Sequence, residues 1–206
     1  MATRLRRGLV AAAAAVIIVV LGACGAAPAP TGSPGQSSAP STPPASKPSE
    51  ASGQPVVLEG RDAGFALSLR IGSDAVDAGA PLDVGATLTW EGAEPQASIW
   101  ASGSGPVSFG IKQVDGDIVL DAVQTADCAQ HDYTRGVAVP VPFRKSGGFS
   151  DDDPNADFYR VYFADPVLRL PTGRWRIAAG AGGFLVPCEM DAPKVEIRLE
   201  AEVVVR

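Results

Sequence analysis

The sequence has little of what catalytic and metal sites are usually built from. Its 206 residues include a single histidine, His131, and three cysteines. One histidine excludes the HExxH zinc proteases and also the blue-copper sites, which use two histidines and a cysteine. No serine lies in a G-x-S-x-G turn, and the glycine-rich segment 102–110 has no lysine after its glycines, unlike a phosphate-binding loop. These absences favour a protein that is not an enzyme.

The sequence also lacks an apolar run long enough to cross a bilayer comfortably. The longest run, residues 9–21, reads LVAAAAAVIIVVL, whereas a membrane-spanning helix needs about 20 apolar residues. The basic residues Arg4, Arg6 and Arg7 precede this run, and small residues follow it. A basic start, a short apolar core and a small-residue exit are typical of an export signal.

The exit of this signal reads LGAC, residues 21–24. A leucine, two small residues and a cysteine resemble the lipobox of bacterial lipoproteins. The resemblance implies a diacylglyceryl group on the Cys24 sulfur, cleavage before Cys24, and a lipid anchor at the extracytoplasmic face of the cell membrane. The alternative is an ordinary secretory signal or an N-terminal anchor helix, with an incidental cysteine. The 13 arginines against 4 lysines indicate a GC-rich genome, such as that of an actinobacterium.

The segment after Cys24 lacks the residues that form a core. Residues 25–54 contain no aromatic residue and no valine, isoleucine, leucine or methionine, and they are rich in proline, serine and alanine. Such a segment cannot bury enough apolar surface to offset its ordering entropy, so we expect a disordered tether over 24–54. The domain boundaries follow: a signal peptide over 1–23, this tether, and a folded domain over 55–206.

Positive charge is scarce once the signal is removed. The mature chain has 14 basic and 23 acidic residues, a formal net charge of −9. An acidic domain is a poor partner for nucleic acid, because the phosphate backbone requires positive charge. We therefore expect no nucleic-acid partner.

The folded part also lacks convincing helical periodicity, and its apolar residues alternate with polar ones. Period-two alternation predicts half-buried strands of antiparallel sheets. The expected strands are 65–71, 81–90, 107–114, 117–123, 136–143, 158–163, 174–178 and 194–206. Strands at this spacing predict an all-β, antiparallel two-sheet sandwich. LPTGRWRIAA (170–179) and DAGAPLDVGATLTWEG (77–92) resemble strands of bacterial immunoglobulin-like domains, which implies a fold and no function.

Two cysteines remain after Cys24 is assigned to the lipid. Cys128 and Cys188 form an even pair in an oxidising compartment, which predicts a disulfide. Because both cysteines fall in expected loops, the disulfide would clamp two connecting segments. The alternative is a metal site that combines His131 with free thiols, since His131 follows Cys128 by three residues.

One acidic segment has the spacing of metal ligands. In SDDDPNAD, residues 150–157, oxygen-bearing side chains alternate at Asp151, Asp153, Asn155 and Asp157. Alternating oxygen ligands in a tight loop suit Ca²⁺, but the EF-hand pattern fails, because it places alanine where glycine is needed and tyrosine where glutamate is needed. A calcium loop of another kind and a solvated acidic turn are the two interpretations.

The remaining choice concerns function. The anchor and the lack of catalytic patterns predict a non-catalytic module of the cell envelope that needs no cofactor and binds a protein or a cell-wall component. The alternatives are a lipoprotein that binds small molecules for a transport system and a cell-wall enzyme that uses carboxylates such as those of 151–157. Aromatic residues gather between Tyr133 and Tyr162, and they form either core or a ligand surface.

Overall fold

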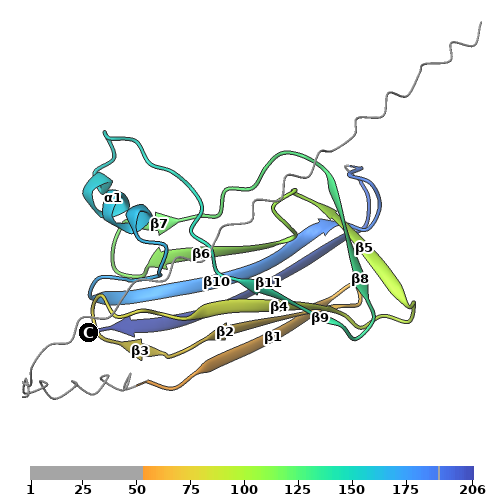
Figure 1. The fold of residues 1–206 in the computed structure, drawn as a ribbon, viewed down its shortest axis with the longest axis horizontal. Helices are drawn as coiled ribbons and strands as arrows, with labels where there is room; N and C mark the ends of the chain where they lie inside the picture. Colours follow the sequence, from red (N-terminus) through yellow and green to blue (C-terminus); the bar gives the residue numbers. More distant parts are fainter. Residues whose placement is uncertain (1–52, 190) are drawn as a thin grey trace, which may run out of the picture. The chain divides into compact units, whose positions relative to one another are not determined.

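The structure, a computed structural model, describes residues 53–189 and 191–206. The predicted signal peptide, the lipid-bearing Cys24 and almost all of the predicted tether lie outside the described residues. The described chain folds into two β-sheets packed together, with one short helix (Figure 1). The prediction of an all-β sandwich is confirmed.

The first sheet is antiparallel and has the strand order β1–β2–β4–β9. Its strands are β1 (Val56–Asp62), β2 (Phe65–Ile71), β4 (Val84–Trp90) and β9 (Ala138–Pro142). The second sheet has the order β3–β11–β10–β5–β8, with β6 and then β7 joined to β10. Its strands are β3 (Ala75–Val76), β5 (Gln96–Ala101), β6 (Val107–Gln113), β7 (Val119–Leu120), β8 (Ala129–Thr134), β10 (Gly173–Phe184) and β11 (Lys194–Val205). Within the described residues, only the short β3–β11 pair is parallel.

The core lies between the sheets and follows the predicted alternation. On β2, Phe65, Leu67, Leu69 and Ile71 all face inward and are fully buried. The inward residues of β10 and β11 meet them, and Trp175 on β10 is also fully buried. Each strand thus contributes one apolar face to a shared core, because successive side chains of a strand point to opposite sides.

The edge strand β9 is protected against further pairing. Phe143, just after β9, donates its backbone N–H to Val84 of β4. Because N–H directions alternate along a strand, the N–H groups of residues 139 and 141 also point toward β4. The backbone nitrogens of residues 140 and 142 face away from the sheet, and both residues are prolines, which have no N–H. Proline at outward positions removes the donors that another strand would use.

The prediction of a strand over 158–163 is wrong, because this segment forms the helix α1 (Ala156–Ala164). Its aromatic and β-branched residues favour a strand by propensity. However, Ala156, Tyr159 and Tyr162 recur every three residues and form the buried face. The helix ends before Asp165–Pro166, where proline disfavours further helix. Tertiary packing of this face therefore overrides the local strand preference.

Helix α1 covers the structure near the start of β10. Phe158 stacks on Trp175 with the ring centroids 6.2 Å apart. The Lys145 ammonium donates to the carbonyl oxygens of Tyr162 (2.5 Å) and Asp165 (2.6 Å). Carbonyl groups at the end of a helix lack a partner within the helix, so a cation there satisfies them. Desolvation lowers the pKa of Lys145. The helix is thus fixed by ring packing on one side and by a charged cap at its end.

Four strands were not predicted, and one was predicted too long. The sequence did not indicate β1, β3, β5 or β8, and the expected strand over 117–123 is reduced to the two residues of β7. Strand β8 reads AQHDYT, in which only Tyr133 is buried. Strands with one apolar anchor give too weak an alternation to detect.

Candidate functional site

The outer face of the second sheet is hollowed near the end of β10. A groove of about 810 Å³ lies there, over β10 and its neighbours β6, β5 and β11. Its floor is formed by Gly180, Gly182 and Ser108, because the alternate residues Ala179 and Ala181 point into the core. We call this site the glycine groove.

The floor glycines are not required by the backbone or by packing. Neither Gly180 nor Gly182 has a positive φ. A Cβ at Gly182 would meet only the Val195 carbonyl oxygen at 3.8 Å, and a Cβ at Gly180 would meet nothing closer than 3.5 Å. Glycine in a strand costs roughly 0.5–1 kcal/mol relative to alanine and often marks a place where a ligand approaches closely. What these two glycines provide is the open space above them.

The adjacent Gly183 has a different role. It points inward, and a Cβ there would collide with the Ile99 side chain and lie 2.9 Å from the Trp100 carbonyl oxygen. Glycine at 183 is therefore needed for β10 and β5 to approach each other. Two neighbouring glycines thus serve opposite faces of one strand, one for packing and one for the groove.

An aromatic pair closes one end of the groove. Trp100 on β5 and Phe184 on β10 are register partners, so their side chains lie next to each other on the outer face. The Lys194 ammonium lies 5.0 Å from the centre of the Phe184 ring. The partners of Gly182 and Gly180 on β11 are Glu196 and Arg198, which form one side of the groove.

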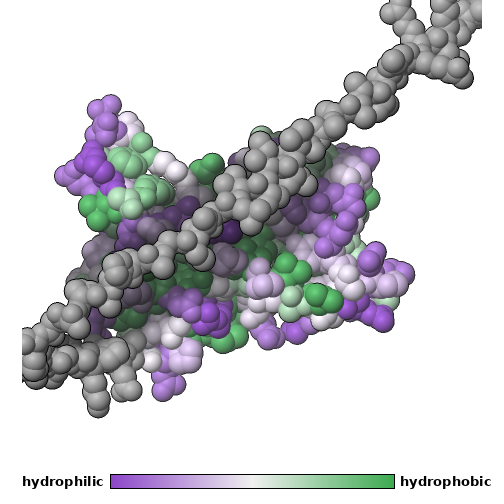
Figure 2. All heavy atoms as spheres, viewed as in Figure 1, coloured by the Kyte–Doolittle hydropathy of each residue, from purple (hydrophilic) through white to green (hydrophobic). Residues whose placement is uncertain are grey.

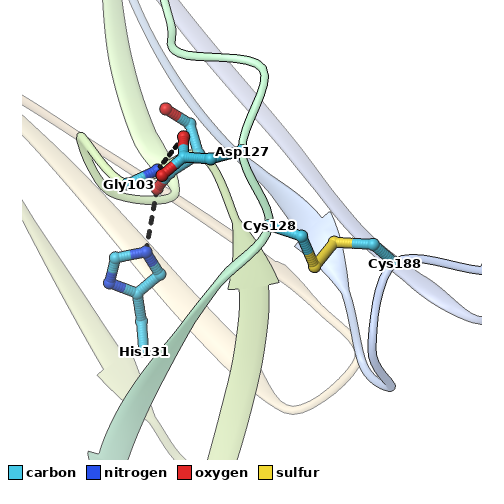
Figure 3. Close-up of a disulfide and its surroundings, with 6 residues drawn as sticks. Gly103, Asp127, Cys128, His131 and Cys188 are labelled. Atoms are coloured by element: carbon cyan, nitrogen blue, oxygen red, sulfur yellow. Dashed lines mark hydrogen bonds between the residues drawn. A yellow bond between two sulfur atoms is a disulfide. The ribbon is translucent and has the colours of Figure 1, made fainter.

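The segment 124–128 forms the opposite side and is held by a buried serine. The Ser102 hydroxyl bonds to the Thr125 hydroxyl at 2.8 Å and accepts the Thr125 backbone N–H at 3.1 Å. The Asp127 carboxylate accepts the Gly103 backbone N–H at 2.9 Å (Figure 3). Hydrogen bonds from Thr125 and Gly103 hold the pKa of Asp127 below its ordinary value. The rim of the groove is thus a fixed segment with an ionised carboxylate.

The predicted Cys128–Cys188 disulfide is present and joins the two sides. Its Cα atoms are 6.1 Å apart. Cys128 lies at the end of the 124–128 segment, and Cys188 lies in the connection between β10 and β11 (Figure 3). The expected clamp between two connecting segments is confirmed, and it strengthens the walls of the groove.

His131 lies near this cluster without forming a catalytic arrangement. Its Nε2 is 2.9 Å from the backbone carbonyl oxygen of Ser102, and among the described residues no hydrogen bond joins it to the Ser102 hydroxyl. A nucleophile needs a base within hydrogen-bond reach of its own oxygen. Among the described residues, no group of three or more histidine, cysteine, aspartate or glutamate side chains could hold a metal ion.

The four oxygen-bearing residues of the acidic segment are placed in different ways. Arg160 bonds to Asp151 at 3.0 Å and to Asp157 at 2.6 Å, so these carboxylates share one guanidinium. Asp153 accepts the backbone N–H of Asn155 at 2.8 Å, which shapes the turn into α1. Figure 2 shows α1 and the adjoining segment as a projection at the upper left in which hydrophilic and hydrophobic residues both reach the surface. The calcium loop stays a prediction.

The aromatic residues of the middle third belong to the core. Tyr133, Tyr159 and Tyr162 are buried, and the phenylalanines among them pack against the same cluster. Desolvation raises the pKa of Tyr133 to about 12. None of these side chains lines the glycine groove.

The glycine groove itself was missed from the sequence. The predicted strand 174–178 stops before the run GAGG at 180–183, because glycine is usually a strand breaker. The available signal was a glycine run that lacks the proline, asparagine or aspartate of a turn.

In comparisons with known proteins, no protein-family model matches this chain, and neither a curated protein nor a solved structure does. Across residues 53–189 and 191–206, the structure contains no helix that is both long enough and apolar enough to span a membrane.

Proposed function

We propose that this protein is a lipid-anchored, extracytoplasmic binding module that holds a ligand in the glycine groove without chemically changing it. The observation that carries the proposal is the pair of floor glycines, Gly180 and Gly182, which neither backbone conformation nor packing requires. Selection for an open surface explains them, because the Cβ of an alanine at either position would meet only ordinary van der Waals contacts.

The rest of the site supports binding rather than catalysis. The walls are fixed by the Ser102 hydrogen bonds and by the disulfide, so the groove is preformed. A preformed groove loses little ordering entropy when it binds a ligand. The disulfide also agrees with an oxidising compartment outside the cytoplasm.

The lipid anchor rests on the sequence pattern around Cys24 and is tested separately. Mass spectrometry of the native protein should find diacylglycerol on Cys24 at the N-terminus of the mature chain. In the Cys24→Ala variant this mass should disappear and the protein should leave the membrane fraction. A wild-type chain that keeps its leader, or that carries a free Cys24 thiol, would remove the anchor from the proposal.

The groove is tested in the native host with a photo-crosslinking residue at Gln124 on the rim. We expect adducts with envelope material from this position and none from Thr87, on the outer face of the other sheet. Gly182→Leu should abolish the adducts, because its side chain fills the groove.

The matched control is Gly85→Leu. Gly85 is also an outer-face strand glycine without positive φ, and a Cβ there would meet only the Val141 carbonyl oxygen at 3.7 Å. Both variants should fold, and only Gly182→Leu should lose the adducts. Adducts that persist in Gly182→Leu, or none at Gln124, would overturn the groove as the binding site.

A further inference from the structure

We infer that the glycine groove binds a neutral, hydroxyl-rich ligand, a segment of a glycan chain. This inference rests on the proposed function, because it names the ligand class of the same site. The free polar groups of the lining, the aromatic end and the charge of the lining all point to this ligand class.

Three polar side-chain groups of the groove are available to a ligand. In the described part of the chain, no hydrogen bond is formed by the Trp100 indole N–H, the Ser108 hydroxyl or the Glu196 carboxylate. The three side chains all line the groove. The indole N–H donates a hydrogen bond, the carboxylate accepts, and the hydroxyl can do both. A ligand that is itself covered with hydroxyl groups can satisfy all three, since each of its hydroxyls also donates and accepts.

The groove has two flat surfaces, its floor and its aromatic end. Gly180 and Gly182 leave most of the floor open beside the Ser108 hydroxyl, and Trp100 with Phe184 supplies the aromatic end. A sugar ring presents a face of C–H groups, which packs on the electron-rich face of an indole ring. The groove likewise combines an apolar aromatic end with polar side chains. A sugar ring, which has an apolar face and polar edges, therefore matches it.

The lining of the groove carries more negative than positive charge. Asp127 and Glu196 are exposed carboxylates in the lining, and the Arg198 guanidinium is paired with Glu200 at 2.6 Å. The Lys194 ammonium lies outside this lining, over the Phe184 ring at the aromatic end. The lining is therefore negative, and the mature chain carries a net charge of −9. An anionic ligand would be repelled, so the glycan must be neutral.

An extended peptide, the main alternative ligand, fits this groove less well. A peptide that binds by strand addition needs unpaired backbone groups at a sheet edge. Strand β10 is paired with β11 along its whole length and with β6 and β5 on the other side. The backbone under the groove is therefore closed to strand addition, and the free groups are side chains.

The test uses the full lipidated protein in detergent and matched pairs of oligosaccharides. Neutral hexose, pentose and N-acetylhexosamine oligomers are compared with the same oligomers carrying uronic acids, by calorimetry. A neutral oligomer should bind, and its uronic-acid counterpart should bind at least about tenfold more weakly. Trp100→Ala should weaken binding about tenfold or more, and Trp100→Phe should weaken it less because it keeps an aromatic ring.

Glu196→Gln gives the sharpest readout, because it removes one negative charge and keeps the shape. This variant should reduce the difference in binding affinity between the neutral oligomer and its uronic-acid counterpart. A merely structural role of Glu196 would leave that difference unchanged. If no neutral oligomer binds, or if the acidic ones bind equally well, the glycan inference is overturned. Envelope adducts at Gln124 that remain sensitive to Gly182→Leu would then show a peptide or other ligand and leave the proposed function standing.

Discussion

Strand β10 starts under an aromatic helix and ends in a groove, and its two ends are stabilised by different means. Near its start, Trp175 is fully buried and stacks on Phe158 of α1. Near its end, glycines face outward, and the neighbouring loops are joined by Cys128–Cys188. Burial of large rings leaves no free space, whereas a covalent cross-link holds two walls in place without filling the volume between them.

The helix end should carry the larger share of the stability. Trp175→Ala removes a fully buried ring, and it leaves the Pro171 carbonyl oxygen without the indole N–H that now lies 2.9 Å away. We expect a loss of about 4–5 kcal/mol in the free energy of unfolding, measured by chemical denaturation.

The matched comparison for this variant is Trp100→Ala at the groove end. Trp100 is only partly buried, so its removal should cost about 1 kcal/mol. Equal losses for the two tryptophans would mean that the groove end is packed as tightly as the helix end.

The disulfide should give the next largest effect. Replacing Cys128 and Cys188 together by serine opens a cross-link between residues 60 positions apart, which costs about 4 kcal/mol at most in the chain-entropy estimate. Thermal unfolding measures the loss. The wild-type protein in reducing agent should unfold like the double variant, since both lack the same cross-link. A reduced wild-type protein as stable as the oxidised one would contradict this stabilising role.

These two ends also show what the sequence could and could not reveal. The strands β2, β4, β6, β10 and β11 were predictable because their inward faces are strongly apolar, and the disulfide was predictable because only two cysteines remained. Helix α1 was mistaken for a strand because Tyr159 and Tyr162 favour strands locally, and only their packing on the sandwich selects a helix.

The groove could not be predicted because it depends on residues that are absent rather than present. The sequence does not distinguish a glycine that packs inward, such as Gly183, from one that opens a surface, such as Gly182. The distinction requires the register between β10 and its neighbours. Asp127 and Trp100 come from separate segments, and their common position around the groove follows only from the paired strands.

The neighbouring glycines should respond to alanine with opposite signs. Gly183→Ala introduces a Cβ against the Trp100 carbonyl oxygen and should destabilise the protein by about 1–3 kcal/mol. Gly182→Ala meets only ordinary contacts and should stabilise it by about 0.5–1 kcal/mol, because alanine loses less backbone entropy on folding. Denaturant titrations of the two variants measure the difference. A Gly182→Ala variant that loses stability would show that the floor glycine is structural.

The smallest effect concerns the rim of the groove and depends on pH. Hydrogen bonds from Thr125 and Gly103 hold the pKa of Asp127 below its ordinary value near 4, so its ionised form is favoured by folding. This contribution is present above that ordinary value and is lost as the pH falls through the lower pKa of the folded state. Asp127→Asn should therefore melt slightly below the wild-type protein at pH 7, and the two melting temperatures should converge as the pH falls below the ordinary value and through the lower pKa of the folded state. Asp152→Asn, on the exposed acidic turn, serves as the control and should follow the wild-type protein throughout. If the melting temperatures of Asp127→Asn and the wild-type protein differ by the same amount at every pH in the acid titration, the shape of the side chain, rather than its charge, holds the rim.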